Sequence, residues 1–314
     1  MSGPVSTVDA AAVPEHGEPT APEVEISESH LATVGRFRVR RALPRRTRRT
    51  VGAWCFADHM GPASVTENAS LDVGPHPHIG LQTVTWLLDG QVLHRDSLGS
   101  EQIISPGQLN LMTAGGGVSH SEEATGHYRG ELEGIQLWIA QPDATRTAGA
   151  RFEHHTDLPA VDLHRGAATV LVGELMGAGS SARHDSPLVG ADLHLGGGRV
   201  LVELRPQWEY AVVVLRGRLV VDGAPLGPGH LGYLGRGRDE LALDADVETR
   251  AMLLGGEPFE ERIVMWWNFV ARSREELAAA YASWDLGDDR FGTIDSPLAR
   301  IPAPTPYWLT MREP

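Results

Sequence analysis

From residue 70 to 270 the chain alternates short β-prone runs with turn signals. Apolar and β-branched residues gather in runs such as TVTWLLDG and YAVVVLRG, and each run ends at a glycine. Short runs of this kind, separated by turn residues, are typical of an all-β sandwich or barrel. The 36 Gly and 21 Pro of the 314 residues agree, because they imply many turns and few long helices.

The pattern occurs twice along the chain. The segment TVTWLLDGQVL followed by PGQLNLMTAGGG is matched by YAVVVLRGRLV followed by PGHLGYLGRG. In each copy a β-rich run reaches a two-residue turn, Asp89-Gly90 or Arg216-Gly217, turns back, and later meets a Pro-Gly that opens another strand. The repeat predicts two tandem β-domains.

One helix is predicted beyond the second β-domain. Ser273 and Glu276 form a capping box at its start, and Gly287 ends it. Its apolar stripe consists of Leu277, Tyr281 and Trp284. The last stretch, IPAPTPYWLTMREP, is interpreted as an extended tail that packs on the surface through Tyr307 and Trp308.

Charge divides the N-terminal region into two parts. Residues 1–30 hold six acids, no Arg and much Pro, Ala and Ser, which predicts a disordered acidic tail. Residues 36–49 carry eight Arg and no acid. Alternation of Arg with Phe37 and Val39 favours a strand with a solvated Arg face, followed by a turn at Pro44, over a phosphate-binding patch. With a net charge of −14, we expect no direct nucleic-acid binding.

Composition also narrows the compartment. No apolar run approaches the roughly 18 residues of a membrane span, and the N-terminus lacks the basic and apolar segments of a signal peptide. A cytoplasmic protein without membrane contact is therefore expected. The one cysteine, Cys55, cannot form an internal disulfide and is interpreted as a buried small hydrophobe rather than a nucleophile.

Two pairs of polar residues share the spacing that places side chains on one face of a strand. His76 and His78 flank Pro77, which confines them to a strand start or a sheet edge. His120 and Glu122 repeat the spacing. A single histidine more often bonds a backbone carbonyl, but two matched pairs in one barrel would bring three imidazoles and a carboxylate together. That set suits Fe, Zn, Cu or Ni.

Other polar residues are weaker candidates. His94 either supports a ligand from outside the site or bonds a carbonyl. His154 and His155 are adjacent, so they face opposite sides of a strand and form no ligand pair, and Glu123 should point away from the metal for the same reason.

In the second repeat, gapless alignment on the glycine turns leaves no imidazole opposite the candidate ligands, which predicts one metal per chain. The aligned residues are Glu203, Arg205, Ala242 and Asp244.

Several segments, taken together, resemble the pirin family over residues 31–292. They are HPHIGLQTVTWLLDG, HRDSLGSEQ, PGQLNLMTAGGGVSHSEE, IQLWIA and LLGGEPFEERIVMWWNFVARSREEL. The resemblance implies two tandem cupin β-barrels, a bicupin, with one short C-terminal helix. We therefore expect a metal-binding cupin over residues 31–165, a second cupin over 166–292 that is held partly by aromatic residues, and an extended tail over 293–314. The aromatic residues are Trp266, Trp267 and Phe269.

The resemblance also implies a metal site. In pirins one iron is held by the residues that match His76, His78, His120 and Glu122, so one Fe(II) per chain is expected, with other divalent metals compatible. Where many pirins carry Glu, this chain has Gln82, which removes one acid that could tune the site.

Three functions follow from the resemblance. The preferred one is an Fe(II) dioxygenase of quercetin 2,3-dioxygenase type, acting as a monomer on a flavonol-like aromatic substrate and O2. Glu122 would be its catalytic base. Candidates for an apolar mouth are Leu81, Met112 and Trp86, although core packing is favoured for each of them. The alternatives are a non-catalytic, iron-dependent regulator that docks on a metabolic enzyme or a transcription factor, and an inert structural metal cupin.

Overall fold

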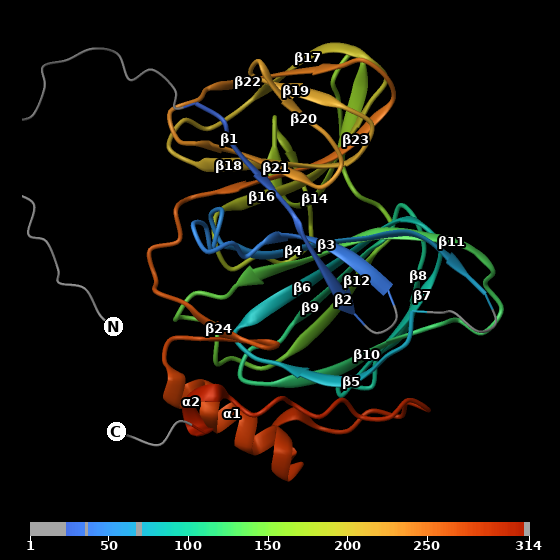
Figure 1. The fold of residues 1–314 in the computed structure, drawn as a ribbon, viewed down its shortest axis with the longest axis vertical. Helices are drawn as coiled ribbons and strands as arrows, with labels where there is room; N and C mark the ends of the chain where they lie inside the picture. Colours follow the sequence, from blue (N-terminus) through green and yellow to red (C-terminus); the bar gives the residue numbers. More distant parts are fainter. Residues whose placement is uncertain (1–22, 35–36, 67–70, 311–314) are drawn as a thin grey trace, which may run out of the picture.

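The computed structural model describes residues 23–34, 37–66 and 71–310. Figure 1 shows two β-barrels stacked along the long axis, with the N-terminal barrel between the C-terminal barrel and two short helices. The predicted all-β class with two tandem barrels is confirmed.

The N-terminal barrel pairs a seven-stranded sheet with a four-stranded sheet. The large sheet has the order β12-β9-β6-β11-β4-β3-β2 and the small one the order β5-β10-β7-β8. The strands of the large sheet are β2 (His30–Val34), β3 (Phe37–Leu43), β4 (Trp54–Val65), β6 (Leu81–Asp89), β9 (Leu109–Thr113), β11 (Gly130–Ala140) and β12 (Arg151–His155). Those of the small sheet are β5 (Val73–His78), β7 (Val92–Asp96), β8 (Glu101–Ile104) and β10 (Val118–Glu123).

The C-terminal barrel repeats this plan with an eight-stranded and a four-stranded sheet. Strands of the large sheet are β1 (Glu25–Glu28), β13 (Ala160–Asp162), β14 (Gly166–Leu175), β15 (Ala178–Gly179), β16 (Leu188–Leu195), β18 (Glu209–Arg216), β21 (His230–Gly235) and β23 (Thr249–Gly256). Strands of the small sheet are β17 (Gly198–Glu203), β19 (Leu219–Val221), β20 (Ala224–Leu226) and β22 (Glu240–Ala245).

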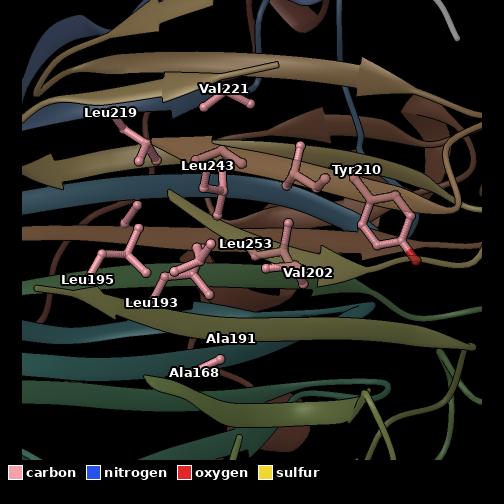
Figure 2. Close-up of a cluster of buried hydrophobic side chains, with 14 of the residues drawn as sticks. Ala168, Ala191, Leu193, Leu195, Val202, Tyr210, Leu219, Val221, Leu243 and Leu253 are labelled. Carbon is pink, nitrogen blue, oxygen red and sulfur yellow. The ribbon is translucent and has the colours of Figure 1, made fainter. Parts of the chain in front are cut away.

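Apolar side chains fill the C-terminal barrel. Figure 2 shows Leu193 and Leu253 from the large sheet pointing toward Val202 and Leu243 from the small sheet. All four are buried. Because leucine and valine occupy this interior, it is a packed core.

The two large sheets face each other and form a second core between the barrels. Trp86 of β6 and Leu111 of β9 lie in one buried cluster with Val213 of β18 and Met252 of β23. The Trp86 indole also donates to the Asp192 carboxylate of the other barrel at 2.9 Å. Trp86 is therefore a core residue between the two barrels, which is the position favoured for it, and it does not line the cavity of the first barrel.

The predicted glycine turns are present, but the strands on either side of each turn do not pair. Gly90 and Gly217 have positive φ and follow β6 and β18. After each turn the chain crosses to the opposite sheet, where β7 pairs with β10 and β19 pairs with β22. The expectation of a hairpin is wrong because the turn joins two sheets of a barrel.

The N-terminal segment contradicts the predicted disorder where it is described. Residues 25–28 form β1, which pairs with β21 at the edge of the C-terminal barrel, and β2 begins at His30. Residues 1–22 of the predicted acidic tail lie outside the described residues. The Arg-rich strand β3 agrees with the prediction, since Phe37 and Val39 are buried and Arg38 is exposed.

The C-terminal segment packs against the N-terminal barrel. Helix α1 (Arg274–Leu286) has Ser273 as N-cap and Gly287 as a left-handed C-cap, as predicted. The short strands β24 (Val264–Trp266) and β25 (Phe269–Ala271) lie beside it, followed by the 3-10 turn η1 (Asp289–Phe291) and helix α2 (Tyr307–Thr310). The prediction of an extended tail is wrong at residues 307–310, which form α2. In this helix Tyr307 is exposed and Trp308 is half-buried.

The aromatic residues of this segment do not hold the second barrel. Phe269 packs in one cluster with Ile79 of the first barrel and with Leu277 and Trp284 of α1. Phe269 also forms a bridge to Ile79. The segment β24–β25 is thus anchored directly after the His76/His78 strand.

Candidate metal centre

The three predicted histidines meet because β5 and β10 are antiparallel neighbours. His76 lies directly opposite His120 in the register, and His78 lies opposite Val118. Strand alternation points all three side chains to the interior, where their ligand nitrogens lie within 4.8 Å of one another. Strand β5 is an edge strand, as Pro77 required.

The outer nitrogens of two imidazoles are held by the backbone. His76 Nδ1 lies 2.9 Å from the Gly74 carbonyl oxygen, and His78 Nδ1 lies 3.0 Å from the Asn268 carbonyl oxygen. A carbonyl only accepts, so each Nδ1 carries the hydrogen and each Nε2 keeps its lone pair. This tautomer presents Nε2 as the metal ligand.

The electrostatics favour the same form. Burial lowers the pKa of His76 to about 4 and the pKa of His78 and His120 well below the usual range. The imidazoles are therefore neutral at pH 7 and able to bind a cation.

The spacing also fits a metal. His78 Nε2 and His120 Nε2 lie 3.1 Å apart. Two nitrogens that bind the same ion at about 2.1 Å, with a nitrogen–metal–nitrogen angle of roughly 90°, lie about 3 Å apart. With no Cys in the group, the donor set suits a catalytic ion with open positions better than a thiolate-based structural zinc.

Glu122 lies at the edge of this group. It is buried on β10 and lines the same cavity as the histidines, but its carboxylate is not among the ligand atoms gathered within 4.8 Å. The register against β5 shifts at this point, from His76 opposite His120 to Val73 opposite Glu122. Burial raises the pKa of Glu122 to about 7. The structure thus brings together three of the four predicted ligands and places the fourth on the wall beside them.

The histidines open into a cavity of about 390 Å³. One wall is a stack: His78 meets the Trp138 ring edge-on at 5.2 Å, Trp138 lies parallel to Phe56 at 4.0 Å, and the Arg41 guanidinium covers Phe56 at 4.5 Å. Arg41 donates to both oxygens of Asp58 at 2.7 and 2.6 Å. The cavity therefore has candidate metal ligands at one end, aromatic rings along its wall and polar side chains beyond them.

Two of the residues proposed for the mouth lie elsewhere. Leu81 and Met112 are fully buried in separate core clusters and do not line the cavity. The C-terminal segment supplies wall residues instead, including Trp267, Asn268 and Ile301. Sequence reasoning missed them because they are far from the histidines along the chain, Asn268 by 190 residues from His78, and nothing in their spacing indicates that contact.

His94 lies beside the candidate ligand His120, in agreement with the first of its two interpretations. Its Nδ1 lies 3.4 Å from His120 Nδ1, and its ring stacks on Phe152 at 4.4 Å.

Gln82 plays no part in the site. Its amide donates to Thr113 Oγ1 at 3.0 Å and to the Arg183 carbonyl at 3.2 Å. The expected effect on tuning is wrong, because the side chain reaches Arg183 in the second half of the chain and does not line the cavity.

The remaining candidates lie as predicted. Cys55 is fully buried, and burial raises the pKa of its thiol to about 12. Glu123 accepts from Ser121 Oγ at 2.6 Å on the face of β10 opposite His120. The adjacent His154 and His155 have separate partners, Asn110 and Glu153.

The residues that the alignment placed opposite the candidate ligands do not face the interior of the second barrel. Glu203 and Arg205 are exposed, and neither Ala242 nor Asp244 is buried, whereas the neighbouring Val202, Leu204, Leu241 and Leu243 are buried. The gapless alignment is one residue out of phase, and a shift of one residue turns every side chain to the other face.

Two stacked barrels, one packed with apolar side chains and one with a buried histidine group, define a bicupin with a candidate metal centre. The pirin family model matches residues 36–139, and the pirin C-terminal cupin domain matches residues 190–292. The chain belongs to the pirin family.

Relatives extend the likeness over most of the chain. A Pseudomonas aeruginosa protein, named provisionally as a quercetin 2,3-dioxygenase, is 47% identical over 276 residues, which cover 87% of each chain. A Caulobacter vibrioides pirin-like protein is 37% identical, covering 86% of this chain and 96% of its own. The crystal structure of quercetin 2,3-dioxygenase from Acinetobacter baumannii superposes with a TM-score of 0.87 at 43% identity, covering 90% of this chain and 95% of that one.

None of the helices in the described part of the chain combines the length and the apolar character needed to cross a membrane.

Proposed function

We propose that this protein is a metal-dependent dioxygenase of the quercetin 2,3-dioxygenase type that acts on a flavonol-like substrate and O2. The observation that carries the proposal is the group of three neutral imidazoles, each with one nitrogen within 4.8 Å of the others, at one end of an aromatic-walled cavity. The names of the Pseudomonas and Acinetobacter relatives support it.

His76, His78 and His120, with Glu122 beside them, would hold one Fe(II). The metal would supply a Lewis acid that holds the 3-hydroxyl and 4-carbonyl oxygens of the flavonol. Glu122 would accept the proton of the 3-hydroxyl, which demands a carboxylate on the cavity wall within reach of the histidine group.

The rest of the cavity is suited to a flat, hydroxylated ligand. Trp138 and Phe56 give an apolar wall next to His78. The Arg41–Asp58 pair, also on the wall, offers hydrogen bonds to hydroxyl groups distant from the histidines. A planar polyphenol matches this order of polar, aromatic and polar surface.

Anaerobic reconstitution with Fe(II), followed by quercetin and O2, tests the proposal. We expect loss of flavonol absorbance together with release of carbon monoxide, and at least a 100-fold slower reaction in His76→Ala. His155→Ala is the matched control, since His155 pairs with Glu153 on β12 and does not line the cavity.

The outcomes separate the two halves of the proposal. Metal-loaded protein that leaves quercetin unchanged would overturn the oxygenase activity and leave the metal site standing. Unchanged metal content in His76→Ala would overturn the metal site itself.

A further inference from the structure

The third histidine of the site is held differently from the other two. His76 and His78 donate through Nδ1 to backbone carbonyls, whereas the outer contact of His120 is His94 Nδ1, at 3.4 Å. Among the outer contacts of these three imidazoles in the described part of the chain, the contact of His120 is the one made to a side chain rather than to the backbone. It is therefore the one that a substitution can change.

Asp96 fixes His94 from the far side. Its Oδ1 accepts from the backbone amides of Leu98 and Ser100 at 2.9 and 3.0 Å, and its Oδ2 lies 3.0 Å from His94 Nε2. Burial opposes the charge on Asp96, but the hydrogen bonds from His94 and Ser100 outweigh it and hold the carboxyl pKa below its ordinary value. Asp96 is thus an ionised carboxylate that only accepts.

The ionised Asp96 sets the direction of the hydrogen bonds that link Asp96, His94 and His120. His94 must donate through Nε2 to Asp96, so a neutral His94 offers the lone pair of Nδ1. His120 must then donate through Nδ1 to His94. Its Nε2 is left without hydrogen and faces His78 Nε2 at 3.1 Å.

The strands hold this arrangement in place. β7 pairs with β10 so that Asp96 lies opposite His120 and His94 lies opposite Glu122. The His94 ring is packed flat against Phe152, at 4.4 Å and 14° between planes. Rotation of His94 out of line is opposed by that packing.

We propose that Asp96 and His94 are positioning residues that set the tautomer of His120 and, through it, the metal affinity of the site. The inference rests on the metal site of the proposed function but not on its oxygenase activity.

Asp96→Asn tests the proton direction in metal-free protein. The Asn oxygen would keep the two backbone amides, so its NH2 would face His94 Nε2 and reverse the chain of donors. ¹⁵N-edited NMR of the imidazoles should report His120 as the Nδ1–H tautomer in the unmodified protein and as the Nε2–H tautomer in the variant. An Nδ1–H His120 in both proteins would overturn the inference.

Metal affinity gives a second readout. Titration with Ni(II) or Co(II) should show 10- to 100-fold weaker binding in Asp96→Asn. His94→Phe keeps a flat ring against Phe152 but removes the acceptor, and should lose a similar factor. His94→Gln, whose amide oxygen can accept from His120, should recover part of the affinity, which a purely structural role of His94 would not predict.

Glu153→Gln is the matched control, because Glu153 forms an acid–histidine pair with His155 away from the cavity. Its affinity should equal that of the unmodified chain. Equal affinity in all these variants would overturn the role of His94 and Asp96. Failure of the unmodified protein to bind either ion would instead overturn the metal site, while the metal-free NMR measurement decides the tautomer claim alone.

Discussion

At the scale of single residues, the candidate site depends on which nitrogen of each imidazole carries the hydrogen. Two backbone carbonyls, those of Gly74 and Asn268, fix His76 and His78. Gly74 lies two residues before His76 on β5, so the His76 ring is fixed locally, whereas Asn268 comes from the C-terminal segment, so the orientation of His78 depends on the fold. Burial then keeps the rings neutral and their inner lone pairs available.

Glu122→Gln separates the two roles assigned to Glu122. The amide cannot take a proton, so quercetin turnover should fall by roughly 10²- to 10⁴-fold. Metal affinity should fall less than in His76→Ala, because the carboxylate lies outside the group of ligand nitrogens. Steady-state turnover and Fe(II) titration of the same preparations measure both effects.

Glu123→Gln is the control for this substitution. Glu123 is the adjacent residue, but it bonds Ser121 on the opposite face of β10. Its variant should keep both turnover and affinity. Unchanged turnover in Glu122→Gln would exclude Glu122 as the base.

The residues of the site could be predicted to the extent that they follow local spacing. The i, i+2 pairs identify His76, His78, His120 and Glu122 because strand alternation is a local property. Gln82 could not be placed, because the identity of its face depends on which sheet packs against β6. The roles of Trp267 and Asn268 depend on a segment far away in the sequence.

At the scale of elements, strands and turns were predictable but their partners were not. Alternation indicates the strands, and Gly90 and Gly217 mark the turns. Nothing local states that a turn leads into the opposite sheet or that β1 crosses to the other barrel. Composition also misled for β1, since an acidic strand is stabilised here by pairing with β21 rather than by its own apolar residues.

Removal of β1 tests its structural role. A chain that begins at His30 loses the pairing with β21, the packing of Val24 on the barrel core and the Glu25–Arg48 ion pair. The free edge of β21 should lower Tm by several degrees and promote self-association. Thermal unfolding and size-exclusion chromatography at two concentrations measure these effects.

Truncation to residues 23–314 is the control, because it keeps β1 and removes only what precedes it. It should unfold at a higher temperature than the chain that begins at His30, and it should elute as the full-length chain does. If both truncated proteins have equal Tm and equal elution, β1 is dispensable for the second barrel.

At the scale of the whole molecule, charged residues join the two barrels beside the apolar interface. Glu133 of the first barrel is fully buried, and its carboxylate lies 2.9 Å from His59 Nε2. Arg216 of the second barrel donates to Glu133 at 2.6 Å and also pairs with Asp89. Asp89 and Arg216 are the last residues of β6 and β18, which occupy the same position in the two repeats. The contact therefore joins equivalent strand ends of the two barrels.

Arg216→Gln should weaken the association of the barrels. It leaves the buried Glu133 with His59 alone, and an uncompensated buried charge costs several kcal/mol. Because the Arg216 side chain is 46% exposed, we expect a smaller loss, about 2 kcal/mol in the free energy of unfolding at pH 7. Urea unfolding measures it, and Arg205→Gln, which breaks the exposed pair with Glu174 and the contact of Arg205 with the Trp208 ring, should cost less, about 1 kcal/mol at most.

The same contact predicts how stability depends on pH. Burial alone would raise the pKa of Glu133, but the hydrogen bonds from His59 and Arg216 outweigh it and hold the pKa below the ordinary 4.5. A carboxyl with a depressed folded-state pKa stabilises the fold above its unfolded pKa, and this contribution is lost as the pH falls through the folded value. The stability difference between the unmodified chain and Arg216→Gln should therefore be full at pH 7 and shrink below about pH 4.5. A second substitution, Glu133→Gln in the Arg216→Gln background, removes the unpaired charge and should restore part of the loss at pH 7. A difference that stays constant from pH 7 to pH 3 would show that Arg216 acts through packing rather than through the charge of Glu133.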